Sequence, residues 1–177
     1  SPAPVLKSCC DLLALKAREG GIDIALDAGR GLPDIRADKQ AFKRIVLNLL
    51  SNAIKFSKPG GCVKVEACVE GGELRCAVED SGIGIAPNDL ACVGRPFFQA
   101  RDSYDRPYEG TGLGLSIVKG LVDLHGGRLD IRSRVDVGTR VIVHLPLEAH
   151  DAIAPSADAL ADVVAASALD AARAMVA

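Results

Sequence analysis

The stretch Asp38-Lys-Gln-Ala-Phe-Lys-Arg-Ile-Val-Leu-Asn-Leu-Leu-Ser-Asn-Ala-Ile-Lys-Phe56 has the apolar periodicity of one long amphipathic helix. It begins with a residue type favoured at the N-cap, and a Pro-Gly-Gly just beyond it predicts the helix end. Asn48, Asn52 and Lys55 are spaced at i, i+4 and i+7, so we expect two amides and an ammonium along one edge of the apolar face. An amide oxygen suits Mg²⁺ and an ammonium suits phosphate, but such a stripe alone is more often a solvated helix face.

Patterns on either side of this helix predict further helices and strands. Alternating residues around Gly71-Gly72 have the signature of a hairpin, and the segment 82–112 breaks the periodicity with Gly, Pro and polar residues. We expect that segment to be a long loop with one short helix at most, and long loops inside compact domains are usually functional. The remaining expected elements are helices at 4–18 and 113–125 and strands at 22–26, 63–69, 74–78, 128–132 and 139–145.

The composition is that of a folded globular domain. The chain has 177 residues, of which 49% are hydrophobic and 25% are charged. This balance excludes a disordered chain, a coiled coil and a collagen-like repeat, and the length suits one domain, alone or with an appendage. Aromatic residues make up only 3%, so the core should be aliphatic and a surface that stacks bases has few rings. With a net charge of -2, no nucleic acid partner is expected.

Cysteine usage predicts a reducing compartment. The six cysteines include no C-x-x-C pair, and Cys62, Cys68 and Cys76 fall in strand-like runs, where we expect them to behave as small hydrophobes. The three histidines are scattered, so no Cys/His metal centre is expected. No run approaches the roughly 20 apolar residues that span a bilayer, and the N-terminus lacks the order of a signal peptide. We therefore expect a cytoplasmic location, which includes the cytosolic part of a membrane-anchored sensor.

Three short glycine-containing motifs follow the long helix. Asp80-Ser-Gly-Ile-Gly84 ends a predicted strand; its glycines allow a sharp turn near a ligand, and its carboxylate can accept from an exocyclic amine. Gly110-Thr-Gly-Leu-Gly114 opens a predicted helix, where backbone N–H groups and the helix dipole favour phosphate. It is neither a dinucleotide fingerprint nor a P-loop, because no strand precedes it and no Lys-Ser or Lys-Thr follows in register. Gly138-Thr139 is a turn into the last strand.

The fixed order of these motifs is more specific than any one of them. The helix with two Asn and one Lys is followed by the strand and turn at Asp80, a long loop with Arg95-Pro-Phe-Phe-Gln99, the Gly-Thr-Gly-Leu-Gly helix and the Gly-Thr strand. This order resembles the catalytic and ATP-binding domain of sensor histidine kinases, in the GHKL ATPase/kinase superfamily, over roughly residues 2–148. Residues 95–127 are similar to alphaproteobacterial cell-cycle kinases of the PleC/DivJ kind.

The resemblance implies a two-layer α/β sandwich of the Bergerat type, with a mixed sheet, helices on one face and a long ATP lid. In its terms, Asn48 to Phe56 resembles the N box, Asp80 to Gly84 the G1 box, Pro96-Phe-Phe98 the F box and Gly110 to Gly114 the G2 box. It implies that Asn52 coordinates Mg²⁺, Lys55 contacts phosphate and Phe56 stacks near adenine, while Asp80 bonds the adenine amine and the G2 glycines wrap the triphosphate.

The resemblance also implies which residues bind ATP and Mg²⁺. Three of them, Asn48, Asn52 and Lys55, are expected to be catalytic, and Asn52 is the expected metal ligand. The expected ATP-binding residues are Asn48, Asn52, Lys55, Phe56, Asp80, Gly82, Gly84, Ile85, Phe98, Arg101, Gly110, Thr111, Gly112, Leu113, Gly114, Leu115 and Thr139. In many relatives a basic residue just after the F box reaches the γ-phosphate. Gln99 stands near that place here, so Arg101 and Arg106 are the nearby substitutes.

Asn48 bears on the type of reaction. Superfamily members that hydrolyse ATP carry a Glu one turn before the metal-binding Asn, and an amide at that place cannot take a proton from water. We therefore expect the γ-phosphate to pass to a protein acceptor. None of the histidines fits an acceptor, so the resemblance implies a His on a separate dimerisation domain of the same kinase, with a response regulator downstream. The fragment itself is expected to be monomeric.

Two other readings share the fold. A degenerate ATP-binding scaffold that signals without phosphotransfer is the alternative function. An anti-sigma-type serine kinase is disfavoured because it normally keeps the Glu that acts as general base.

The kinase domain is expected at residues 1–148, followed by an Ala-rich extension at 149–177. Twelve of its last 27 residues are Ala, and the apolar spacing of Leu160, Val164 and Met175 predicts an appended helix, with a frayed tail as the alternative.

Overall fold

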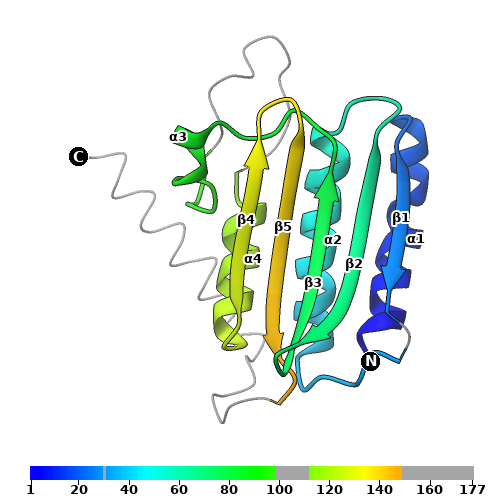
Figure 1. Cartoon of the computed structure of the whole chain (residues 1–177), viewed down its shortest axis with the longest axis vertical. Coiled ribbons are helices and arrows are strands. Elements are labelled where there is room, and N and C mark those ends of the chain that lie inside the picture. The colour runs from blue at the N-terminus through cyan, green and yellow to red at the C-terminus, as the bar shows by residue number, and fades with distance from the viewer. Residues whose placement is uncertain (30, 99–111, 149–177) are drawn as a thin grey trace.

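A computed structural model describes residues 1–29, 31–98 and 112–148. In chain order its elements are α1 (Pro2–Glu19), β1 (Asp23–Ala28), α2 (Lys39–Phe56), β2 (Cys62–Glu70), β3 (Glu73–Asp80), α3 (Pro87–Leu90), α4 (Gly114–Leu124), β4 (Arg128–Arg134) and β5 (Gly138–Pro146). Figure 1 shows a five-stranded sheet with α1, α2 and α4 behind one of its faces. The two-layer α/β sandwich is confirmed, and each helix and strand that the sequence predicts inside the described ranges forms.

The sheet is mixed, and its register brings the ends of two strands together. The strand order is β1-β2-β3-β5-β4, with β1 parallel to β2 and the other neighbours antiparallel. Asp80, the last residue of β3, pairs with Val63 of β2 and with Thr139 of β5. The carboxylate of Asp80 and the start of β5 therefore lie side by side at one end of the sheet.

An aliphatic core joins the sheet to the helices, as the scarcity of aromatic residues predicts. Leu6 of α1, Leu50 of α2 and Leu121 of α4 have no exposed surface. They belong to one buried cluster with Val65 of β2 and Leu74 of β3. Each such side chain stabilises the fold by about 1.5–3 kcal/mol on burial, and together they fix the helices on the sheet.

Hydrogen bonds between side chains and backbone groups anchor the start of α2. The Asp38 carboxylate accepts a hydrogen bond from the N–H of Ala41 (2.6 Å), which confirms the predicted N-cap. The N–H of Asp38 itself donates to Nε2 of His125 (3.2 Å), while Nδ1 of His125 lies 2.7 Å from the carbonyl oxygen of Leu121. His125 directly follows α4, so it connects the end of α4 to the start of α2.

The opposite face of the sheet carries charged side chains. Arg140 of β5 forms ion pairs with Glu66 of β2 and Glu79 of β3, and Nε2 of His144 lies 3.2 Å from the carboxylate of Asp130 on β4. Strand alternation places these residues away from the helices. This face is charged where the helical face is apolar, and the functional site forms on the helical side.

The cysteine prediction is right for one strand and wrong for another. Cys76 of β3 is buried, but Cys62 and Cys68 of β2 are exposed. Their positions explain the error: both are in phase with Lys64 and Glu66, whereas the intervening apolar residues of β2 face the core. The two-residue period of the strand therefore overrides the apolar character of these two thiols.

No helix within the described ranges combines the length and the apolar character needed to cross a bilayer. The Ala-rich extension lies outside the described residues, so its helix and the domain boundary near residue 148 stay predictions.

Candidate functional site

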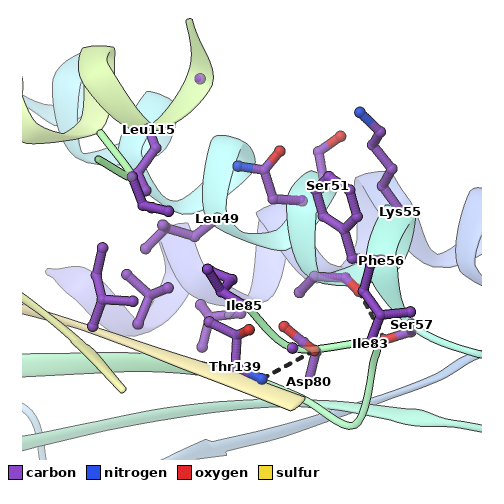
Figure 2. Close-up of a pocket in the computed structure, with 18 of the residues that line it drawn as sticks. Leu49, Ser51, Lys55, Phe56, Ser57, Asp80, Ile83, Ile85, Leu115 and Thr139 are labelled. Carbon is purple, nitrogen blue, oxygen red and sulfur yellow. Dashed lines mark hydrogen bonds between the residues drawn. The ribbon is translucent and has the colours of Figure 1, made fainter. Parts of the chain in front are cut away.

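A cavity of about 1110 Å³ lies between α2, the sheet and the start of α4 (Figure 2). It brings together most of the residues that the sequence singles out. Those that line it are Asn48, Asn52, Lys55, Phe56, Asp80, Gly84, Ile85, Phe98, Gly112, Leu113, Gly114, Leu115 and Thr139. Gly82 does not line it, and Arg101, Gly110 and Thr111 lie outside the described residues.

Asp80 presents a half-buried carboxylate to this cavity. Its Oδ1 accepts hydrogen bonds from the N–H of Gly82 (2.9 Å) and from the N–H of Thr139 (3.2 Å), and the second bond is drawn in Figure 2. Burial raises the pKa of the Asp80 carboxyl, and the two N–H groups oppose this rise because they favour the charged form. Among the described residues no hydrogen bond reaches Oδ2, so this oxygen can accept from a ligand.

Two glycines hold the Asp80 turn by allowing backbone segments to touch. A Cβ on Gly82 would lie 2.2 Å from the carbonyl oxygen of Phe56, at the end of α2. A Cβ on Gly138, whose φ is +134°, would lie 1.9 Å from the carbonyl oxygen of Asp80. Since these neighbours are backbone atoms, they cannot move aside without shifting a whole element. Gly82 therefore packs the turn against the end of α2. The sequence instead predicts that Gly82 contacts the ligand.

The two amides of α2 lie on one stripe, as their spacing predicts, and the fold turns this stripe toward the start of α4. A Cβ on Gly114 would lie 3.3 Å from Oδ1 of Asn48 and 3.6 Å from Nδ2 of Asn52. Nδ2 of Asn48 donates to the carbonyl oxygen of Arg44 (2.9 Å), so this half of the amide is engaged with its own helix. A glycine at position 114 leaves both amides accessible from the cavity.

Lys55 lies beside the aromatic ring that follows it. Its Nζ is 4.7 Å from the centroid of the Phe56 ring, which is the geometry of a cation–π contact. Burial lowers the pKa of the Lys55 ammonium, and the positive charge of Lys16 lowers it further. Figure 2 shows Lys55 and Ser51 rising from the same helix. An ammonium that is partly withdrawn from water interacts more strongly with an anion.

The first turn of α4 lies in the cavity wall. Leu113 occupies the N-cap position, and no side chain caps this helix. The first N–H groups of a helix have no acceptor within it, and the helix dipole adds positive potential at the same place. Because Gly112, Leu113 and Gly114 all line the cavity, its α4 side suits an anionic group.

Several lining residues escaped the sequence analysis. Val78 and Val141 form part of the apolar wall, and alternation with Asp80 and Thr139 along the same strands is a signal that identifies them. Ser51 lies on α2 one turn before Lys55. Lys16 reaches the cavity from α1, and no local pattern marks it because α1 joins the site only through tertiary packing.

The lining suits a metal ion that is held largely by a ligand's own oxygens. No group of three His, Cys, Asp or Glu side chains that could hold a metal ion occurs in the described ranges 1–29, 31–98 and 112–148. Mg²⁺ typically takes one or two protein oxygens and completes its shell with phosphate and water. The neutral amide oxygen of Asn52 fits that role.

Comparison with known proteins identifies the family. A family model described as "Histidine kinase-, DNA gyrase B-, and HSP90-like ATPase" matches residues 37–149, more than half of the chain. The chain belongs to this family. Among its ATPase-family relatives, an uncharacterised sensor-like histidine kinase of Rhizobium meliloti is 46% identical over 150 residues, covering 85% of this chain and 29% of the relative. The histidine protein kinase DivJ of Caulobacter vibrioides is 44% identical over 136 residues, covering 77% and 23%. The alphaproteobacterial likeness is thereby confirmed.

Solved structures place this ATPase-family domain among histidine kinases as well. Full-length ShkA in complex with AMPPNP is 32% identical with a TM-score of 0.72, and the match covers 85% of this chain and 30% of that one. The histidine kinase ThkA in complex with the response regulator protein TrrA is 25% identical with a TM-score of 0.68, over 82% and 40%. The chain thus spans less than a third of the two curated relatives, and it corresponds to their catalytic, ATP-binding part.

Proposed function

We propose that this domain binds ATP with Mg²⁺ and delivers the γ-phosphoryl group to a histidine on the dimerisation domain of the same kinase. One observation carries the proposal: the cavity has two chemically different ends. At the end of β3 lies a carboxylate whose Oδ2 accepts no hydrogen bond from the described residues, while the N-terminus of α4 forms another part of the lining and the Lys55 ammonium lines the cavity from α2. An adenine amine is a donor and a triphosphate is an anion, so one nucleotide satisfies both ends.

Different residues bind the adenine, the phosphates and the metal ion. Oδ2 of Asp80 accepts from the adenine amine, while apolar residues such as Ile85 and Val141 enclose the ring. Lys55 and the N–H groups at the start of α4 bind phosphate oxygens, and Asn52 is the protein ligand of Mg²⁺. The metal, when bound, neutralises charge on the phosphates and thereby lowers the barrier to transfer.

Transfer to a protein acceptor is favoured over hydrolysis by the acidic residues that are present. Within the described lining the carboxylates are Asp80, Asp89 and Asp136. Oδ1 of Asp80 accepts hydrogen bonds from two backbone N–H groups and its Oδ2 is assigned to the adenine amine, while Asp136 is paired with Nζ of Lys58 at 2.9 Å. Asn48 lies beside the start of α4 and its amide cannot take a proton. A response regulator is the proposed downstream partner, in line with the ThkA–TrrA complex.

A transfer assay with matched variants tests the proposal. The wild type, Asn52→Ala and Asn88→Ala are given radiolabelled ATP, Mg²⁺ and the separately expressed dimerisation domain of the same kinase. Asn88 is an exposed residue of α3 outside the cavity, so it serves as the control. We expect Asn52→Ala to lose about 100-fold or more in transfer rate and less in nucleotide affinity, because the metal ligand matters most where charge shifts.

The outcomes of this assay distinguish a kinase domain from a nucleotide-binding scaffold and test Asn52 as the metal ligand. Near-normal transfer by Asn52→Ala would show that another residue holds the metal. A wild type that binds ATP but transfers nothing would instead identify a nucleotide-binding scaffold.

A further inference from the structure

The ends of α1 and α2 meet beside the cavity. The N–H of Gly60, after α2, donates to the carbonyl oxygen of Gly21, after α1, at 2.7 Å. This bond joins the turns that follow the two helices, so their last turns lie next to each other. Lys16 belongs to the last turn of α1, and Lys55 to the last turn of α2.

Lys16 and Lys55 line the same cavity from these two different helices. Ser51, one turn before Lys55 on α2, also lines it and adds a hydroxyl to the two cations. The positive charge of Lys16 contributes to lowering the pKa of Lys55, after the larger effect of burial. Coulomb interactions fall with distance, so this effect agrees with two ammonium groups that face a common space.

A purely structural account of Lys16 is available but incomplete. Basic residues in the last turn of a helix interact favourably with its dipole, and this applies to Arg18 as much as to Lys16. Only Lys16 of the two lines the cavity. Within the described residues Lys16 makes no ion pair, although like charges placed together cost free energy unless an anion joins them.

We propose that Lys16 binds the polyphosphate of the nucleotide together with Lys55, as a second cation supplied by α1. The inference rests on the proposed function and adds a residue that the motifs do not contain. It divides phosphate recognition between α1, α2 and the start of α4. Since Lys16 carries a compact charge on a flexible stem, it contributes attraction without fixed geometry. The nucleotide affinity that Lys16 contributes should therefore grow with the number of phosphates on the ligand.

Calorimetric titration with ATP, ADP and AMP tests this dependence. The variants are Lys16→Met, Lys16→Arg and, as a matched control on the same helix turn, Arg18→Met. We expect Lys16→Met to weaken ATP binding about fivefold, ADP binding less and AMP binding little, with the difference shrinking as salt is raised. Lys16→Arg should restore most of the loss, and Arg18→Met should bind ATP as the wild type does.

A second measurement does not depend on nucleotide. The pKa of Lys55, followed by NMR of labelled lysine side chains in the domain without ligand, should rise in Lys16→Met because a neighbouring positive charge has been removed. An unchanged Lys55 pKa would show that the two ammonium groups do not share a space.

The proposal is overturned if the three nucleotides lose equal affinity in Lys16→Met, or if Arg18→Met loses as much as Lys16→Met. A wild type that binds none of the nucleotides overturns the proposed function itself. Wild-type ATP binding that Lys16→Met leaves intact overturns only the role of Lys16.

Discussion

Replacing Asp80 with Asn separates the carboxylate's role in binding from its role in folding. The substitution keeps the shape of the side chain, and its amide oxygen can still accept from the N–H groups of Gly82 and Thr139. At the other branch, Oδ2 is exchanged for an NH₂ group. That group would meet the adenine amine donor to donor.

The expected loss in ATP affinity follows from the hydrogen bond between the adenine amine and Oδ2 that the substitution removes. A hydrogen bond to a charged acceptor contributes about 1.5–3 kcal/mol, which corresponds to a loss in ATP affinity of about 10- to 150-fold. Folding should respond in the opposite direction. Burial raises the pKa of Asp80, so the charged carboxylate destabilises the native state at neutral pH relative to a neutral side chain. We therefore expect Asp80→Asn to be at least as stable as the wild type at pH 7.

The raised pKa of Asp80 also makes the stability depend on pH. A carboxyl whose pKa is raised in the native state binds a proton more tightly there than in the unfolded chain, so its penalty disappears as pH falls through that raised pKa. The stability advantage of Asp80→Asn should therefore be largest near neutral pH and shrink toward the ordinary carboxyl value of 3.8. Urea unfolding across this range and calorimetric ATP titration provide the data. Equal ATP affinity would refute the adenine assignment, and a large loss of stability at pH 7 would show that the charge holds the fold.

Three further changes probe the packing, the reaction and the chain boundary. Gly82→Ala should lower the free energy of unfolding, measured in urea, by about 2–4 kcal/mol, because the new Cβ meets the Phe56 carbonyl oxygen. The control Gly20→Ala, whose nearest contacts lie at 3.4 Å, should change that free energy little. Equal effects of the two substitutions would contradict the close approach at Gly82. Asn48→Glu should give slow phosphate release from a domain that otherwise shows almost none, and steady release by the repurified wild type would argue against a kinase. Deleting residues 149–177 should leave ATP affinity unchanged in the same titration, and lost binding would place the domain boundary elsewhere.

Local patterns predict the helices and strands and the row of site residues on α2. The apolar period and the Asp38 cap define α2 within one residue, and the i, i+4, i+7 spacing places Asn48, Asn52 and Lys55 along the cavity. These features depend on one helix and its own geometry, so they can be read without tertiary information.

The remaining features depend on contacts between distant segments. Gly82 looks like a ligand-binding glycine in sequence, yet its lack of a side chain serves the approach to the Phe56 carbonyl, which only the fold reveals. Lys16 becomes part of the site because the turns after α1 and α2 are hydrogen-bonded to each other. The apolar character of Cys62 and Cys68 predicts burial, but the phase of β2 places both thiols on its exposed face.

The division of the cysteines provides a reporter of how often the core opens. Cys62 and Cys68 are exposed on β2, whereas burial raises the pKa of Cys9 to about 11 and that of Cys76 to about 12. Since the thiolate is the reactive form, a maleimide added at neutral pH modifies the first pair on the native domain. It reaches the second pair only when the layer between helices and sheet separates. The lag between the two classes of label, read by mass spectrometry with and without nucleotide, thus measures the free energy of that opening through the chain's own cysteines, without any substitution.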